Sequence, residues 1–277
     1  MTGSLLPRVI GVIHLPRLPY TTVKTQVDVS WMAELASSEA RALERIGFEG
    51  VLVENFGDKP YLKRVLDPLA LSAMTVIVKR VVDSVKIPVG LNILRNSGRE
   101  AYSIALTTGA KFIRVNALSE TIISDSGVIE PEAPFMRDVR LNYPGVMIFA
   151  DVLVKHAGSL TILSLRAKET IRSRSLTTAL KDILEDTVER GGADSVIVTG
   201  ERTGKPPSVE VLKIIKKYSP APVYVGSGAS THNIKSLMEN ADGVIVGSFI
   251  KKNGIAGNPL DEKRAEDFIR ALREVLK

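Results

Sequence analysis

The sequence predicts an eight-stranded α/β barrel of the TIM type, in which each strand is followed by a helix. Eight short apolar runs alternate with segments of helical periodicity along the 277 residues. The runs are continuously apolar, as expected for parallel strands that are buried on both faces. Eight such units favour a closed barrel over an open sheet, and no Gly-x-Gly-x-x-Gly motif follows the first run, which argues against a dinucleotide-binding sheet. We expect a single barrel domain over residues 1–277.

In chain order, the predicted strands cover residues 9–15, 50–54, 87–93, 111–116, 146–151, 194–199, 221–225 and 242–246. The helical patterns between them cover residues 31–46, 69–85, 100–108, 176–190, 209–218, 231–240 and 263–276, and a weaker pattern covers 133–141. Strands two to four resemble strands six to eight in sequence. Two related half-barrels would produce this internal similarity, and so would the composition that buried strands have in common.

Three connections are longer than usual for a barrel, at residues 16–30, 117–131 and 156–175. Each follows a predicted strand, so we expect all three at the C-terminal face, where barrel enzymes carry their lids. The third is basic, and for it a structural insertion or an oligomer contact is as good an explanation as a lid.

Composition excludes several classes of protein. The chain has no cysteine, so disulfides, thiolate catalysis and cysteine-ligated zinc are excluded. No window holds about 18 uninterrupted apolar residues, so we expect no membrane span, and the first residues do not read as a signal peptide, which predicts a cytoplasmic protein. The net charge is +6, but the basic residues are spread over predicted helices and aromatic residues make up only 5%. A solvated basic surface is therefore favoured over nucleic-acid binding.

Two glycine-rich turns near the C-terminus predict a phosphate site. One predicted strand runs into Gly226, Ser227 and Gly228, and the next runs into Gly247 and Ser248. Such turns present backbone N–H groups to an anion with no side chain in the way, and the loops after strands seven and eight are the usual phosphate site of an α/β barrel. The alternative is that these glycines only permit tight turns. If they bind an anion, we expect a side chain at Gly228 to abolish binding and leave the fold intact.

Polar residues cluster where the predicted strands pass into loops, and a barrel brings all these strand ends to one face, as in a catalytic mouth. The cluster comprises His14; Glu54, Asn55 and Asp58; Asn92, Arg95 and Asn96; Arg114 and Asn116; Asp151, Lys155 and His156; and Thr199, Gly200, Thr203 and Gly204.

Within this cluster we expect His14, Glu54, Asp151 and Lys155 to be catalytic. The two carboxylates are candidates for a general acid or base, and Lys155 could neutralise an oxyanion or form a Schiff base. As alternatives, His14 is a buried structural histidine, Lys155 is solvated, and one of the carboxylates forms a structural ion pair with Arg114.

The remaining polar residues are predicted to bind substrate, and Gly200 is predicted to join the phosphate-binding turns. The substrate-binding residues are Asn55, Asn92, Arg95, Arg114, Asn116, His156 and Thr199. Among them, Arg95 and Arg114 could clamp a carboxylate or a second phosphate. A divalent metal held by His14, Glu54, Asp151 and His156 is a further alternative, although no ligand spacing supports it.

The chain resembles the BtpA family in stretches that run through nearly its whole length. They are residues 11–19, 53–58, 88–96, 112–116, 150–157, 198–204, 225–228 and 241–248. The resemblance implies a barrel of the ribulose-phosphate-binding type. It also implies two kinds of function, because a cyanobacterial member is associated with photosystem I biogenesis as a peripheral membrane protein, whereas other members are labelled nucleosidases or sugar-phosphate enzymes.

Two hypotheses for the function follow. The first is an enzyme that binds and transforms a phosphorylated sugar or nucleoside-type molecule at the C-terminal barrel face, by lyase, isomerase or glycosidic-cleavage chemistry. The convergent acid, base and cation set favours it. The second is a non-catalytic biogenesis or assembly factor for a membrane complex, with peripheral membrane association, although no amphipathic, aromatic-edged helix supports it. The surface is compatible with a monomer or a homo-oligomer.

Overall fold

The computed structural model of the protein describes residues 6–22, 28–154, 157–160, 163–164, 176–200 and 205–276. Eight parallel strands close into a barrel in the order β1–β11–β10–β9–β7–β4–β3–β2. They are β1 (Val9–His14), β2 (Gly50–Glu54), β3 (Val89–Asn92), β4 (Phe112–Val115), β7 (Met147–Val152), β9 (Ser195–Val198), β10 (Val223–Val225) and β11 (Gly243–Val246). The predicted barrel and its eight strands are confirmed, with ends that differ by two residues at most.

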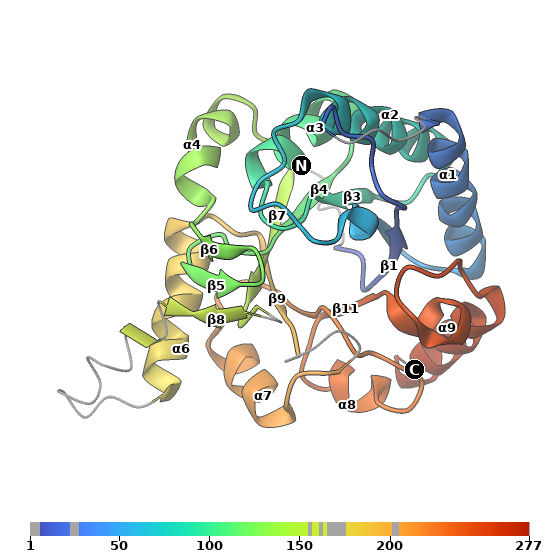
Figure 1. Ribbon diagram of the computed structural model, residues 1–277. Helices are drawn as coiled ribbons and strands as arrows, with labels where there is room; N and C mark the ends of the chain where they lie inside the picture. The colour runs from blue at the N-terminus through green and yellow to red at the C-terminus, as the bar shows by residue number, and fades with distance from the viewer. Residues whose placement is uncertain are drawn as a thin grey trace.

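The helices surround the barrel, as Figure 1 shows. They are α1 (Val29–Ile46), α2 (Pro68–Ser84), α3 (Gly98–Thr108), α4 (Ala133–Asn142), α6 (Leu176–Glu185), α7 (Val209–Tyr218), α8 (Ile234–Met238) and α9 (Glu262–Val275). Side chains of Asp28, Asp67, Ser208 and Asp261 accept hydrogen bonds from the first free N–H groups of α1, α2, α7 and α9, which stabilises these helix starts.

One predicted helix is wrong in its length. Residues 231–240 were expected to be helical, but α8 covers only Ile234–Met238. The Asn233 side chain accepts a hydrogen bond from the Ser230 N–H and donates one to the Gly228 carbonyl. This side-chain turn competes with the helix and delays its start.

The barrel interior holds a closed apolar layer. Alternate side chains of a strand point to opposite faces, and those that point inward form a cluster of Ile10, Val12, Leu52, Phe112, Phe149, Ile197, Tyr224 and Ile245. The ring centroids of Phe112 and Phe149 are 4.9 Å apart, and those of Phe149 and Tyr224 are 5.0 Å apart. This layer fills the barrel interior, so no ligand can bind inside it, and a ligand at the mouth lies above it, at the carboxyl ends of the strands.

The long connection predicted at residues 117–131, after β4, contains strands that the sequence did not predict. It forms an antiparallel hairpin of β5 (Ile122–Ser124) and β6 (Gly127–Ile129), and β8 (Ala157–Ser159) pairs with the free edge of β5. Figure 1 draws these strands in green and yellow-green, apart from the barrel. Strands of three residues are too short for a periodic pattern to reveal them. Most of the predicted connection 156–175 lies outside the described residues.

Candidate functional site

The candidate site lies at the carboxyl ends of the barrel strands, two residues beyond the apolar interior layer. Because side chains alternate along a strand, a residue two positions after an inward-pointing one also points inward. The positions that follow this rule are His14, Glu54, Asn92, Arg114, Asp151, Thr199, Gly226 and Gly247. The predicted polar mouth is therefore a consequence of strand register.

The two predicted glycine turns meet in one narrow cleft. Gly226, Ser227, Gly228, Gly247 and Ser248 all line it, together with His14, Glu54 and Arg114. Within the described part of the chain, the N–H groups of Ser227, Gly228 and Ser248 have no acceptor. These donors can bind an anion.

The expectation that a side chain at Gly228 leaves the fold intact is wrong. Gly228 has a φ of +77°, which L-residues rarely adopt, and a Cβ there would lie 2.1 Å from the Pro206 nitrogen. The backbone would have to move. Gly247 is the better position for filling the cleft, because its φ is −112° and a Cβ there would meet the His14 ring, with Cε1 at 3.2 Å.

Glu54 is a nearly buried carboxylate that contacts no cation in the part of the chain that the structure describes. It is 6% exposed, and its Oε2 accepts a hydrogen bond of 3.1 Å from the Asn92 side chain. Among the described residues, no lysine or arginine nitrogen lies within ion-pair distance of it. Glu54 lines both the cleft of the glycine turns and a second cavity beside it, so its carboxylate can reach a ligand in either.

Arg114 and Asp151 form a buried, two-pronged ion pair. Arg114 donates from Nε and Nη2 to the two Asp151 oxygens at 2.8 and 2.9 Å, and the side chains are 3% and 0% exposed. Asn116 adds a third hydrogen bond to Asp151 at 2.8 Å. Burial acts to lower the pKa of Arg114, but the Asp151 and Glu54 carboxylates outweigh it and raise that pKa. Of the two carboxylates considered as partners of Arg114, Asp151 is the one that pairs with it.

His14 lines the cleft next to the glycine turns. Its Nδ1 accepts a hydrogen bond of 3.2 Å from the Gly257 N–H, and its ring lies against Phe56 with centroids 4.4 Å apart. A ring nitrogen that accepts an N–H bond carries no proton, so neutral His14 carries its proton on Nε2. His14 can therefore donate a hydrogen bond from Nε2.

A second cavity of about 520 Å³ shares Glu54, Phe56 and Arg114 with the cleft. Its lining includes the predicted residues Glu54, Arg95, Arg114 and Asn116, and also Phe56, Lys59, Pro60, Tyr61, Leu94 and Asp125. Burial raises the pKa of Tyr61, and the negative charge of Glu54 adds to this. Burial lowers the pKa of Lys59, although Glu54 opposes the shift.

Sequence reasoning missed Lys59, Tyr61 and Asp125, because they lie on loops beyond the strand ends. The available signal was the charged and aromatic run Lys59-Pro60-Tyr61, which follows β2 closely.

Several predicted residues lie elsewhere. Asn55 is fully buried, and its amide bonds to Asp58 and to both backbone polar groups of Leu94, so it shapes the loops and lines neither cavity. Thr199 and Gly200 line a different cavity, bounded by the 205–208 segment. Lys155, His156, Thr203 and Gly204 lie outside the described residues.

Neither a metal site nor a membrane span is seen in the described residues. They contain no group of three or more histidine, aspartate or glutamate side chains arranged to hold a metal ion. They also contain no helix with the length and apolarity that crossing a membrane requires.

Comparison with known proteins gives matches over nearly the whole chain. The BtpA family model matches residues 7–274. The photosystem I biogenesis protein BtpA of Synechocystis sp. is 42% identical over 271 residues, which cover 97% of this chain and 89% of that protein. An uncharacterized protein of Methanocaldococcus jannaschii is 40% identical over 261 residues, covering 94% of this chain and 93% of that one.

Solved structures share the barrel at low sequence identity. Thiamine phosphate pyrophosphorylase from Pyrococcus furiosus has a TM-score of 0.56 at 15% identity and covers 97% of this chain and 96% of its own. The (S)-3-O-geranylgeranylglyceryl phosphate synthase of Thermoplasma acidophilum, in complex with sn-glycerol-1-phosphate, also has a TM-score of 0.56 at 15% identity, with coverages of 97% and 94%. These likenesses show the fold.

Proposed function

The chain belongs to the BtpA family, and we propose that it is an enzyme that binds a phosphorylated sugar or nucleoside-type molecule at the C-terminal mouth of its barrel and transforms it by proton transfer. One observation carries the proposal: the glycine turns and the Glu54 carboxylate line the same cleft. A phosphate held by the N–H groups of the turns, which have no acceptor among the described residues, leaves the rest of the substrate next to Glu54. Anchoring one end of a substrate while reacting at the other gains rate through positioning.

The roles of the residues follow from their contacts. Glu54 has no cation partner among the described residues and serves as the general base or acid. Arg114 lines the same cleft and stabilises negative charge that develops on a substrate oxygen as the proton leaves. Both carboxylate oxygens of Asp151 accept hydrogen bonds from Arg114 or Asn116, so Asp151 is a positioning residue in this proposal. His14 lines the same cleft and is assigned a contact with the substrate.

Lys155 and His156 remain candidates for contacts with the same substrate. They follow β7 directly in sequence, and the carboxyl ends of barrel strands are where catalytic residues concentrate. Two of the structural neighbours, the thiamine phosphate pyrophosphorylase and the geranylgeranylglyceryl phosphate synthase, are named for phosphorylated compounds, which agrees with the proposed ligand class.

The test combines a ligand screen with one isosteric variant. Sugar phosphates, nucleotides and their unphosphorylated counterparts are screened by thermal shift, because a ligand of the native state raises the melting temperature. Ligands that bind are then followed by phosphorus and proton NMR for turnover. We expect Glu54→Gln to keep the ligand-induced shift and to lose turnover by about a hundredfold or more.

The matched control is Glu266→Gln, which makes the same change at an exposed position on α9. It should behave as wild type. If phosphorylated and unphosphorylated compounds shift the melting temperature equally, or if Glu54→Gln turns over as fast as wild type, the proposed function is rejected.

A biogenesis or assembly role is the second candidate. The observation that favours it is the 42% identity with a protein named for photosystem I biogenesis. In this alternative the partner is a membrane protein complex, approached by peripheral association, and acid–base chemistry at Glu54 is not needed. Gene deletion in the host, followed by complementation, separates the two. Full complementation by Glu54→Gln favours the assembly role, whereas failure of a folded Glu54→Gln protein favours the enzyme.

A further inference from the structure

Arg95 presents a nearly buried cation whose counter-ion is exposed. The Arg95 side chain is 6% exposed, and its Nη2 donates to Asp125 at 2.7 Å, whereas the Asp125 side chain is 58% exposed. The Arg95 Nε is buried and has no hydrogen-bond partner among the described residues. Its guanidinium carbon lies 4.9 Å from the centre of the Tyr61 ring, and all three residues line the second cavity. The Arg95 guanidinium is thus buried and lacks one hydrogen-bond acceptor, whereas its partner, the Asp125 carboxylate, is exposed to solvent.

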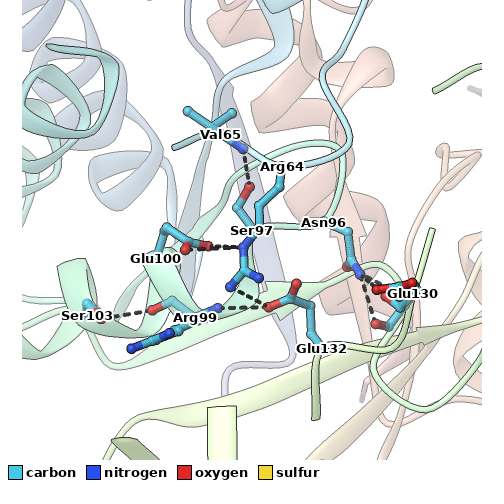
Figure 2. Close-up of polar contacts among 10 residues, drawn as sticks. Arg64, Val65, Asn96, Ser97, Arg99, Glu100, Ser103, Glu130 and Glu132 are labelled. Atoms are coloured by element: carbon cyan, nitrogen blue, oxygen red, sulfur yellow. Dashed lines mark hydrogen bonds and ion pairs between the residues drawn. The ribbon is translucent and has the colours of Figure 1, made fainter. Parts of the chain in front are cut away.

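The base of the hairpin that carries Asp125 is firmly attached. The buried Asn96 side chain donates to the Ala117 and Glu130 carbonyls at 3.0 and 3.1 Å and accepts from the Ala117 N–H at 3.0 Å. After the hairpin, Glu132 is 4% exposed and lies 3.6 Å from Arg64. Figure 2 shows the Asn96–Glu130 and Arg64–Glu132 contacts beside the start of α3. Both ends of the hairpin are therefore anchored to the barrel.

The tip of the hairpin is attached more weakly. Besides the Asp125–Arg95 pair, the Ser126 hydroxyl donates to the Tyr61 carbonyl at 2.9 Å. An ion pair with one exposed partner contributes little to stability, because solvent screens it. An incoming anion can replace Asp125 without disturbing the anchored base.

The charges of the cavity match such an exchange. Apart from the Arg114 pair, its lining carries two cations, Lys59 and Arg95, and two carboxylates, Glu54 and Asp125. If the Asp125 carboxylate leaves the second cavity, the lining keeps one positive charge without a matching negative charge in a partly buried space. A second anion would restore the balance and could also reach the unpartnered Arg95 Nε.

We propose that Asp125 occupies the position of a second anionic group of the substrate on Arg95, and that a doubly anionic substrate displaces this carboxylate and releases the hairpin tip. The inference rests on the proposed function, since the first anionic group is the phosphate at the glycine turns. Glu54 lines both the cleft and the cavity and so lies between the two anion positions. The substrate class is therefore a compact phosphorylated molecule with a phosphate or carboxylate at its other end.

The experiment compares two probes that differ only in the second anion, ribulose 5-phosphate and ribulose 1,5-bisphosphate, by isothermal titration calorimetry. In Asp125→Asn, which removes the competing carboxylate, we expect the bisphosphate to bind about tenfold more tightly than in wild type and the monophosphate to bind equally. In Arg95→Gln, bisphosphate affinity should fall about tenfold or more, again with little change for the monophosphate. Asp267→Asn, which breaks an exposed ion pair on α9, is the matched control and should change neither affinity.

Hydrogen exchange provides a second readout. Amides of residues 124–127 should exchange faster with the bisphosphate bound than with the monophosphate bound, because the tip is released. If the monophosphate binds and neither variant alters the preference between the probes, this inference is overturned while the proposed function stands. If neither probe binds the wild-type protein, or if both bind Gly247→Val as tightly as wild type, the phosphate does not bind at the glycine turns and both are overturned.

Discussion

Asp151→Asn provides the sharpest test of the buried ion pair at the mouth of the barrel. The substitution removes one charge and keeps the size of the side chain. It leaves Arg114, which is 3% exposed, without its counter-ion, and it places an amide N–H₂ group where the guanidinium and the Asn116 amide both require acceptors. Breaking a buried pair on one side costs about 3–5 kcal/mol of unfolding free energy. For a domain of this size, that corresponds to a fall of about 6–20 °C in melting temperature.

The assay is urea unfolding followed by circular dichroism, with Glu54→Gln as the comparison. Glu54 has no cation partner among the described residues, so its neutral variant should unfold at the wild-type urea concentration or a higher one, as is common at functional sites. Arg114→Met combined with Asp151→Asn should recover much of the lost stability, because no charge is then left buried alone. If Asp151→Asn is as stable as wild type, Asp151 is not a structural partner, and its role as a catalytic carboxylate regains support.

Three further predictions concern other parts of the structure. Burial raises the pKa of Glu120 above its ordinary 4.5, so the stability that this group contributes is complete below pH 4.5 and is lost as the pH rises through the higher folded-state pKa. Glu120→Gln should therefore flatten the pH dependence of stability in urea titrations and increase stability at neutral pH. An unchanged pH profile would contradict this prediction. Gly247→Val should abolish the thermal shift produced by phosphorylated ligands, because the valine side chain enters the cleft beside His14. If the variant still binds these ligands, the anion lies elsewhere. Lys251→Met should lower the unfolding free energy by roughly 3 kcal/mol, because the fully buried Lys251 forms an ion pair with Glu39 at 2.8 Å. Adding Glu39→Gln should restore part of the lost stability. If the single variant is as stable as wild type, the ion pair does not stabilise the fold.

The sequence by itself determined the barrel and the place of its mouth. Each barrel strand is a mainly apolar run of three to six residues between helical patterns. This pattern is local, so it can be recognised without knowing which segments are in contact. The glycine turns after β10 and β11 were predicted to meet and they line one cleft. Their convergence follows because β10 and β11 are neighbouring parallel strands, so their carboxyl ends lie side by side.

Only the tertiary structure decided how the polar side chains of the mouth are paired. Arg114 and Asp151 are 37 residues apart in the chain, and Arg95 and Asp125 are 30 residues apart. Local periodicity says which face a strand residue points to, but not which of several carboxylates lies within hydrogen-bonding distance of a guanidinium. That depends on the register between strands and on the paths of the loops. Asp125 reaches the cavity only because a hairpin folds over the strand ends, and short strands held by distant partners leave no periodic trace in the sequence.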